Sequence, residues 1–275
     1  MKPAAFTYHR ARDVRGATGL LAELGEDAKV LAGGQSLVPM MNFRLARPAH
    51  LVDIGGLREL RYLRTDDDGL HVGALTTHHD VEVAPESATG HGFDVLRSAM
   101  AWVGHLPIRT RGTVGGSLAH GDATAEWGLL VMLLDARIVA ENSSGVRREI
   151  PADELFLGFF TTTLEPDELI VEVVFPRRAP NAAITEFAQR RGDFAVVSAA
   201  VDLDSGRVAL GGVAEVPARA PEAEAVLAGG GSFAECAEAA AAAIDPPSDA
   251  NGSAAYRRSL ARTLVSSACE QAFHG

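Results

Sequence analysis

Two short glycine-rich stretches, far apart in the chain, constrain the fold more than any other feature of the sequence. The first is AGGQSL at residues 32–37, and the second is GTVGGSL at residues 112–118, which continues into AHGD at residues 119–122. Glycine permits backbone conformations and close approaches that a side chain forbids. Each stretch therefore predicts a loop whose backbone N–H groups can surround an anion, and two such loops suggest a ligand with two phosphates.

The first stretch lies between a predicted strand and a predicted helix. Residues 29–32 are apolar enough for a short strand, and Ser36 is placed to cap a helix over residues 37–45, with Pro39 in its first turn. This order directs free N–H groups and the positive end of a helix dipole at one point. A plain turn explains so short a pattern as well, so the first stretch alone is weak evidence.

The second stretch is longer and denser in small residues. It combines glycines with two hydroxyl side chains: Gly112, Thr113, Gly115, Gly116, Ser117 and Gly121. The pattern predicts an open loop whose N–H groups and hydroxyls suit phosphate oxygens. The alternative is a tight structural crossover between two elements.

Two carboxylates follow the second stretch at a spacing of four residues. Asp122 and Glu126 lie around the start of a predicted apolar helix over residues 123–134. Acidic side chains at that position complement the helix dipole, which is one explanation. The other is that one of them accepts hydrogen bonds from ribose or ribityl hydroxyls. The nearby histidines have no metal-ligand spacing, and we expect no metal site.

Several common functional classes lack their sequence motifs. The chain has no G-x-G-x-x-G, no Gly-Lys pair for a P-loop, no H-E-x-x-H, no C-x-x-C and no G-x-S-x-G. A formal net charge of −11 disfavours nucleic acids and anionic membrane surfaces as partners. Two cysteines, Cys236 and Cys269, are too few for an iron–sulfur cluster, which needs about four. The patterns therefore disfavour a hydrolase, a kinase, a zinc enzyme or an iron–sulfur protein.

The 275 residues allow one large or two modest domains. The sequence has no apolar signal segment at its N-terminus and no run of about 18 apolar residues, so we expect a cytoplasmic protein without a membrane span. A proline-rich linker at residues 176–180 separates an α+β region from three predicted antiparallel strands, at residues 184–189, 196–203 and 207–213. Alanine-rich helices follow from residue 217 onward.

Four motifs in order along the chain resemble the FAD-binding flavoproteins of the molybdenum hydroxylases. The two glycine stretches resemble the two FAD-pyrophosphate loops of that family, which includes the medium subunit of carbon monoxide dehydrogenase and a module of xanthine dehydrogenase. LFLGFF at residues 155–160 with TLEPDE at residues 163–168 is a third match, and RRGDFA at residues 190–195 is a fourth. The resemblance covers nearly the whole chain.

The resemblance implies a fold and a domain division. The expected fold is α+β: a two-part PCMH-type FAD-binding domain over residues 1–176, with parts at about 1–56 and 57–176, and a C-terminal domain at residues 180–275 with a three-stranded antiparallel sheet and helices.

The resemblance also assigns cofactor contacts by position. The pyrophosphate would contact backbone amides and small side chains of both stretches: Leu31, Ala32, Gly33, Gly34, Gln35, Ser36, Leu37, Thr113, Gly115, Gly116 and Ser117. Polar and apolar contacts to the rest of the FAD fall at Asp122, Glu126, Val103, Leu164 and Phe194. Many relatives have Lys at the position of Glu186, the xanthine dehydrogenase branch has Asn in place of Ser117, and Phe194 lacks a tyrosine hydroxyl.

By this resemblance the chain is the FAD-binding, electron-transferring subunit of a molybdenum hydroxylase. Electrons would come from a molybdopterin-binding large subunit through a 2Fe-2S small subunit to FAD, and then to an external acceptor. No residue of the chain needs to be a nucleophile or a general base, because the flavin carries the redox chemistry. Two alternatives are a stand-alone FAD-dependent oxidoreductase on the same fold and a scaffold that has lost its FAD.

Overall fold

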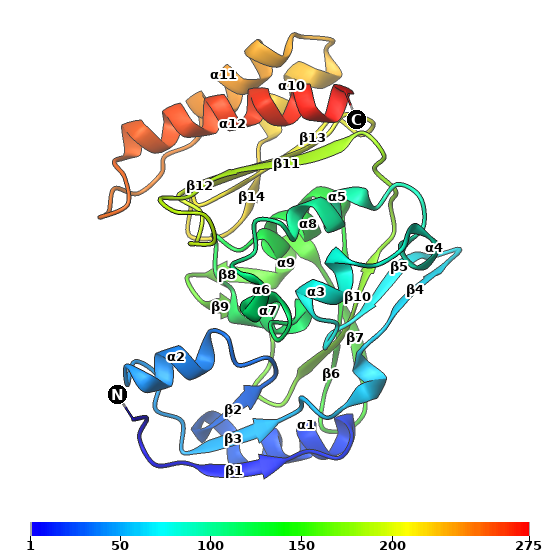
Figure 1. Ribbon diagram of the computed structural model, residues 1–275, viewed down its shortest axis with the longest axis vertical. Coiled ribbons are helices and arrows are strands. Elements are labelled where there is room, and N and C mark those ends of the chain that lie inside the picture. Colours follow the sequence, from blue (N-terminus) through cyan, green and yellow to red (C-terminus); the bar gives the residue numbers. More distant parts are fainter. Residues whose placement is uncertain (1, 275) are drawn as a thin grey trace.

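The computed structural model describes residues 2–274, and its β-sheets are arranged in layers along the length of the molecule (Figure 1). A three-stranded parallel sheet lies at the N-terminal end, a five-stranded antiparallel sheet in the middle and a four-stranded antiparallel sheet at the C-terminal end. None of the helices in the described residues has both the length and the apolar character of a membrane span.

The N-terminal layer is built from short strands that pair in the order β1-β3-β2. Its elements are β1 (Thr7–Arg10), α1 (Val14–Leu24), β2 (Ala28–Leu31), α2 (Leu37–Asn42) and β3 (His50–Asp53), with single 3-10 turns at Gly25–Asp27 and Arg58–Leu60. Asp13 caps α1 by accepting a hydrogen bond from the Gly16 N–H at 2.6 Å. All three parallel strands end at the same edge of the sheet, which is where α/β sheets bind ligands.

The middle layer has the strand order β4-β5-β10-β6-β7, with its own helices packed on one face and α1 on the other. Its elements are β4 (Leu63–Asp66), β5 (Gly69–Gly73), α3 (His78–Glu82), α4 (Glu86–Thr89), α5 (Asp94–Ala99), α6 (Leu106–Arg109), α7 (Val114–His120), α8 (Glu126–Leu134), β6 (Arg137–Glu141), β7 (Arg147–Pro151), α9 (Ala152–Leu155), β8 (Phe156–Gly158), β9 (Thr161–Thr162) and β10 (Leu169–Phe175). Strands β8 and β9 form a separate hairpin.

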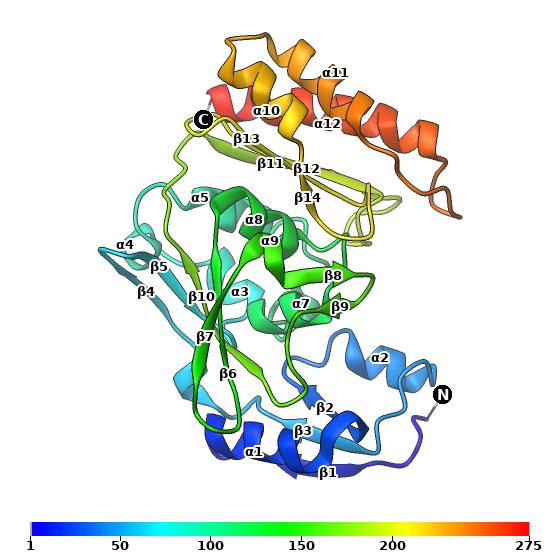
Figure 2. The same cartoon turned by 180° about the vertical axis from the view of Figure 1, so that it is seen from behind.

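Helix α8 connects the middle layer to the C-terminal domain. Every residue after Glu126 in this helix is buried, and a helix that is apolar all round must be enclosed by other elements. It lies between the five-stranded sheet and the C-terminal sheet in both views (Figures 1 and 2). Ile184, Ala200 and Ala209 of the C-terminal sheet join the same hydrophobic core as α8.

The C-terminal domain is a sheet covered on its outer face by three helices (Figure 2). Its elements are β11 (Ala182–Phe187), β12 (Val197–Asp202), β13 (Arg207–Gly211), β14 (Ala218–Arg219), α10 (Pro221–Ala228), α11 (Phe233–Ala243) and α12 (Ala254–His274). The three predicted strands are present, and the two-residue β14 adds a fourth at the edge beside β13. Side chains alternate along β12, so Ala199 and Val201 face the helices while Ala200 faces α8.

Some elements differ from the sequence expectations. Strand β1 and the β8–β9 hairpin were not predicted, and the helix expected over residues 37–45 is shorter, because α2 ends at Asn42. The second glycine stretch, expected to be an open loop, is mostly helical as α7.

Candidate functional site

The two glycine stretches are in direct contact. A Cβ atom on Gly33 would lie 2.1 Å from the carbonyl oxygen of Arg111 and 2.9 Å from the Cα of Gly112. Both distances are shorter than a real Cβ contact, so only glycine fits at residue 33. On the other side of the contact, a Cβ on Gly116 would lie 3.7 Å from the Cβ of Ala32. The two stretches therefore lie directly against each other, and Arg111, just before the second stretch, reaches the cavity described below.

The first stretch presents a run of unpartnered backbone donors. Within residues 2–274, no acceptor takes a hydrogen bond from the N–H groups of Gly33, Gly34, Gln35, Ser36 or Leu37. Gly34 has a positive φ of 74°, which turns the chain at the end of β2. Consecutive free N–H groups at such a turn form an anion-binding concavity.

Ser36 does not have the predicted capping role. It precedes α2, but its backbone is helical and its side chain makes no capping hydrogen bond. The backbone N–H groups at the start of α2 are therefore not covered by the Ser36 hydroxyl and remain available to a ligand.

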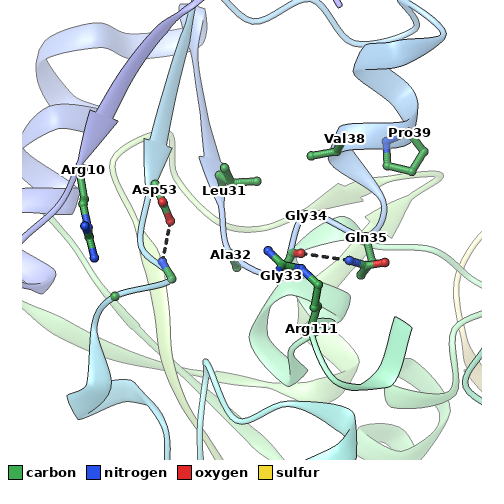
Figure 3. Close-up of a pocket in the computed structure, with 12 residues that line it drawn as sticks. Arg10, Leu31, Ala32, Gly33, Gly34, Gln35, Val38, Pro39, Asp53 and Arg111 are labelled. Atoms are coloured by element: carbon green, nitrogen blue, oxygen red, sulfur yellow. Dashed lines mark hydrogen bonds between the residues drawn. The ribbon is translucent and has the colours of Figure 1, made fainter. Parts of the chain in front are cut away.

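A cavity of about 570 Å³ opens over this stretch (Figure 3). It lies where β1, β2 and β3 end, at Arg10, Leu31 and Asp53. The residues that line it are Arg10, Leu31, Ala32, Gly33, Gly34, Gln35, Val38, Pro39, Asp53, Gly55, Gly56 and Arg111. The guanidinium groups of Arg10 and Arg111 give the site two positive charges, and Asp53 supplies one carboxylate.

Two hydrogen bonds fix the Asp53 carboxylate, one from β1 and one from the turn after β3. It accepts hydrogen bonds from the Tyr8 hydroxyl and from the Gly55 N–H, the latter at 2.8 Å. Arg10 is its register partner across the β1–β3 pair. Arg10, Asp53 and Arg111 were not predicted as site residues. The parallel pairing of β1 with β3 brings the first two together, and a short sequence motif does not encode that pairing.

The second stretch contributes a capped helix start and no open loop. Thr113 is the N-cap of α7, and its hydroxyl accepts a hydrogen bond from the Gly116 N–H at 3.2 Å. The N–H groups of Val114 and Gly115 donate to Thr76 and Ala74 at 3.0 and 2.9 Å. These donors are already engaged within the chain, so the expectation of a loop with free amides is wrong for this stretch.

Gly115 and Gly116 leave no room for a Cβ, because other atoms lie close to them. A Cβ on Gly115 would lie 2.7 Å from the Cβ of Ala74, and one on Gly116 would lie 2.7 Å from the Thr113 hydroxyl. The second stretch thus packs against β5 on one side and against the first stretch on the other.

A buried histidine, His78, packs against the first residue of the second stretch. A Cβ on Gly112 would lie 2.7 Å from the His78 ring, and the indole N–H of Trp127 donates to His78 Nδ1 at 2.9 Å. Burial lowers the pKa of His78 to about 4, with a smaller contribution from Arg109. His78 is therefore neutral at pH 7, as its acceptor role toward Trp127 requires. Thr77 caps α3 with a capping box.

The two carboxylates after α7 have different environments. Asp122 accepts from the Thr124 N–H at 2.9 Å and from its hydroxyl at 2.7 Å, which closes a local turn. Glu126 is the first residue of α8, and burial raises the pKa of its carboxyl to about 7, with a further contribution from Asp122. Glu126 is thus held closer to its neutral form than an exposed glutamate.

Three predicted apolar contacts do not line the cavity. Val103 is buried in the main core, Leu164 packs partly against that core, and Phe194 is 66% exposed. Gly192, two residues before Phe194, packs against the His105 ring, where a Cβ would lie 2.6 Å away. The loop that carries Phe194 is therefore held next to the segment that carries Val103.

A strand-edge cavity with a row of free amides, closed on one side by the residue that precedes the second glycine stretch, defines a protein that binds a phosphate-containing cofactor. The profile of the family described as "FAD binding domain in molybdopterin dehydrogenase" matches residues 4–178, and that of "CO dehydrogenase flavoprotein C-terminal domain" matches residues 182–272. The chain belongs to this family of FAD-binding subunits of molybdenum hydroxylases. The predicted family, the mixed α/β fold class, FAD as cofactor and the oxidoreductase class are confirmed.

Relatives match along the whole chain. The 6-hydroxypseudooxynicotine dehydrogenase complex subunit alpha of Paenarthrobacter nicotinovorans is 40% identical over 100% of this chain and 96% of its own. Carbon monoxide dehydrogenase from Hydrogenophaga pseudoflava superposes with a TM-score of 0.93 at 36% identity, covering 100% of this chain and 99% of that one. Quinoline 2-oxidoreductase from Pseudomonas putida 86 superposes with a TM-score of 0.92 at 35% identity, with the same coverage.

Proposed function

We propose that the cavity at the first glycine stretch holds the pyrophosphate of FAD. The five free N–H groups of residues 33–37 donate to phosphate oxygens, and Arg10 and Arg111 offset the negative charge. The volume of about 570 Å³ is typical of a ligand pocket and suits part of a dinucleotide. The run of free donors is the observation that carries this assignment, because buried or half-buried N–H groups ordinarily have partners.

The remaining predicted contacts keep their proposed roles with one change. Leu31 and Ala32 shape the wall that leads into the cradle, while Gly115 and Gly116 let the second stretch approach it. Within the described residues the N–H groups of Val114, Gly115, Gly116 and Ser117 are engaged, so Ser117 acts through its hydroxyl, whereas the Thr113 N–H has no acceptor and is available to the phosphate. Asp122 and Glu126 face the polyol part of FAD, Phe194 lies near its flavin ring, Leu164 packs against the flavin or the adenine, and Val103 makes an apolar contact to the cofactor.

We further propose that the chain transfers electrons within a molybdenum hydroxylase. When bound, FAD supplies the redox chemistry, taking electrons from a 2Fe-2S small subunit served by a molybdopterin-binding large subunit and passing them to an external acceptor. The support is the full-length match to relatives named as subunits of such complexes, among them the medium subunit of nicotine 6-hydroxylase of Paenarthrobacter nicotinovorans. The chain itself binds and orients the cofactor.

We also propose the boundaries of the two domains and a cytoplasmic location. The FAD-binding domain spans residues 1–176, with parts at about 1–56 and 57–176, and the C-terminal domain spans residues 180–275. The free thiols of Cys236 and Cys269, both buried, suit the reducing cytoplasm. Limited proteolysis that cuts near residue 178 and leaves two stable fragments supports the division, whereas a single cut inside the C-terminal sheet contradicts it.

Co-purification tests the function. The chain is expressed with its neighbouring genes, affinity-tagged and isolated, and the complex is analysed for FAD, iron and molybdenum. We expect a stable assembly with all three. A monomer that holds FAD and turns over a small substrate without partners would instead support a stand-alone flavoenzyme, and a chain that never binds FAD would support a scaffold.

A further inference from the structure

Two thiols face each other inside the C-terminal domain, at the opposite end of the molecule from the cavity at the first glycine stretch (Figure 1). Cys236 lies on α11 and Cys269 on α12, and neither side chain is exposed. Both belong to the hydrophobic core between the C-terminal sheet and its helices, and the Cys269 thiol donates a hydrogen bond to Cys236. They are the only two cysteines in the sequence, so the one disulfide that can form within these 275 residues joins them.

Helices α11 and α12 pack antiparallel, and their register places the two cysteines opposite each other. Three contacts define this register: the Phe233 and Phe273 rings with centroids 5.9 Å apart, the Glu238–Arg262 ion pair, and a hydrogen bond from the Arg258 guanidinium to the Ile244 carbonyl oxygen at 3.1 Å. Residue numbers rise along α11 while those of the partners fall along α12. The pair Cys236–Cys269 falls between the first contact and the second, so the thiol contact follows from the way the helices pack.

Small side chains allow the two helices to approach closely. Most of the other buried residues of α11 and α12 are alanines: Ala237, Ala240, Ala241, Ala261, Ala268 and Ala272. The distance between packed helices depends on the side chains at their contact, and alanine holds them apart least. A disulfide requires Cα atoms within about 7 Å of each other, so a close helix pair with facing cysteines favours the bond.

The two thiols differ in their tendency to ionise. Cys236 lies in the first turn of α11, after the N-cap Ser232, where the positive end of the helix dipole favours a thiolate. The hydrogen bond from Cys269 also lowers the pKa of Cys236, whereas that bond and burial raise the pKa of Cys269. Cys236 is therefore the nucleophile of the pair, and Cys269 is the thiol that resolves it.

The pair lies near the ends of both helices, which gives a small oxidant a route to it. A glycine turn at residues 229–231 precedes α11, with a φ of 74° at Gly230, and α12 ends at His274, where the neighbouring Phe273 is 68% exposed. Helix ends open locally at a lower cost in free energy than the core does. Opening of these ends admits a molecule as small as hydrogen peroxide to the thiols.

We propose that Cys236 and Cys269 are an oxidation site, at which hydrogen peroxide closes a disulfide that locks α11 to α12. The Cys236 thiolate attacks one peroxide oxygen, the O–O bond breaks, and the hydroxide that leaves takes up a proton, so that Cys236 becomes a sulfenic acid. The Cys269 sulfur then attacks the Cys236 sulfur, the S–S bond forms, and the S–O bond breaks to release water with the Cys269 proton. The two sulfurs lose two electrons in total, and the peroxide becomes two waters.

Peroxide treatment of the purified full-length chain tests this. The chain is reduced with dithiothreitol, freed of it and exposed to hydrogen peroxide, and free thiols are then counted in urea and the intact mass is measured. We expect both thiols to disappear, with a mass loss of two hydrogen atoms and a band of monomer size on a non-reducing denaturing gel. The crosslink should lower the unfolding equilibrium constant roughly 100-fold, seen as a higher urea midpoint that dithiothreitol reverses.

Single variants separate the roles of the two thiols. Cys269→Ala keeps the nucleophile without its partner, so peroxide should leave a sulfenic acid at Cys236 that dimedone labels. Cys236→Ala should keep its remaining thiol under the same treatment. Neither variant should gain stability from peroxide. The double variant Cys236→Ala with Cys269→Ala is the matched control for oxidation elsewhere in the chain, and its urea midpoint should not move.

Three results would overturn the proposal. The thiols of the wild type could persist in the folded chain and react only in urea that unfolds it. Peroxide could yield sulfinic acids or a disulfide between two chains in place of the internal bond. The internal bond could form and leave the urea midpoint unchanged, which would reject the lock. If a variant fails to fold, the wild type decides alone, because its thiol count, mass and urea midpoint before and after peroxide need no variant.

Discussion

Gly33 faces the carbonyl oxygen of Arg111 so closely that a Cβ on residue 33 would lie 2.1 Å from it. This single contact joins the end of β2 to the segment before α7, although about 80 residues separate them in the chain. It fixes how closely the two glycine stretches approach each other, and it requires glycine at residue 33.

Gly33→Ala is expected to separate the first glycine stretch from the segment at Arg111. The methyl group would force the Arg111 carbonyl away, and overpacking of this kind typically costs about 1–3 kcal/mol. Because the displaced atoms form the cradle, we expect FAD affinity to fall by roughly 100-fold, measured by fluorescence titration. Gly19→Ala in α1, where a Cβ meets nothing within 4 Å, is the matched control and should bind FAD normally. If Gly33→Ala and Gly19→Ala bind FAD with equal affinity, the Gly33–Arg111 contact does not determine FAD binding.

Gly116→Val tests the second glycine stretch. Its Cβ would lie 2.7 Å from the Thr113 hydroxyl that caps α7 and would point toward Ala32, so the side chain disturbs both the cap and the gap between the stretches. We expect FAD binding to be lost while the fold survives, with a destabilisation of about 1 kcal/mol from the cap. Circular dichroism and urea unfolding check the fold. A variant that binds FAD with wild-type affinity would show that the second stretch is not at the phosphates.

Arg111→Gln and Arg10→Gln test the charges that line the cavity. Both side chains are positioned to offset the pyrophosphate charge, and a charge-assisted hydrogen bond contributes about 1.5–3 kcal/mol. We expect each variant to bind FAD at least about tenfold more weakly at low salt, with a smaller difference at high salt because ions screen the charges. Arg15→Gln, an exposed residue of α1, is the control. A loss of FAD affinity that does not depend on salt would indicate lost packing rather than lost charge.

The sequence predicted the elements that are determined by contacts between residues close together in the chain. The strand, glycine turn and helix at the first stretch are found as β2 and α2. In each case the determining contacts lie within a few residues, so an apolar run is sufficient evidence.

The parts that the sequence did not predict depend on distant contacts. Helix α7 was missed because a run rich in glycine has a low helix propensity; its stability comes from the Thr113 cap and from packing of Gly115 on Ala74. Arg10 and Asp53 were missed because they meet only through the β1–β3 register. The sixteen predicted contacts stay a proposal, because no cofactor is present to test them.

Trp127 donates a buried hydrogen bond to His78, whose ring lies against Gly112. Burial lowers the pKa of His78 from 6.5 to about 4 in the folded chain, whereas the unfolded chain keeps the ordinary value. The unfolded state therefore binds a proton first as the pH falls. The stabilisation is fully present above about pH 6.5 and is lost progressively as the pH falls toward 4, by up to about 1.4 kcal/mol per pH unit and on the order of 3 kcal/mol in total.

His78→Gln removes the titrating group, so its stability should change less with pH over this window than that of the wild type. Urea unfolding at a series of pH values, followed by tryptophan fluorescence, measures the slope of the free energy of unfolding for each protein. His91→Gln is the control, because the side chain of His91 is exposed and should leave the wild-type slope unchanged. Parallel pH profiles for the wild type and His78→Gln would mean that the pKa of His78 is not lowered by folding, so that the folded chain takes up the proton as readily as the unfolded chain and breaks the Trp127 hydrogen bond, since an imidazolium nitrogen cannot accept it.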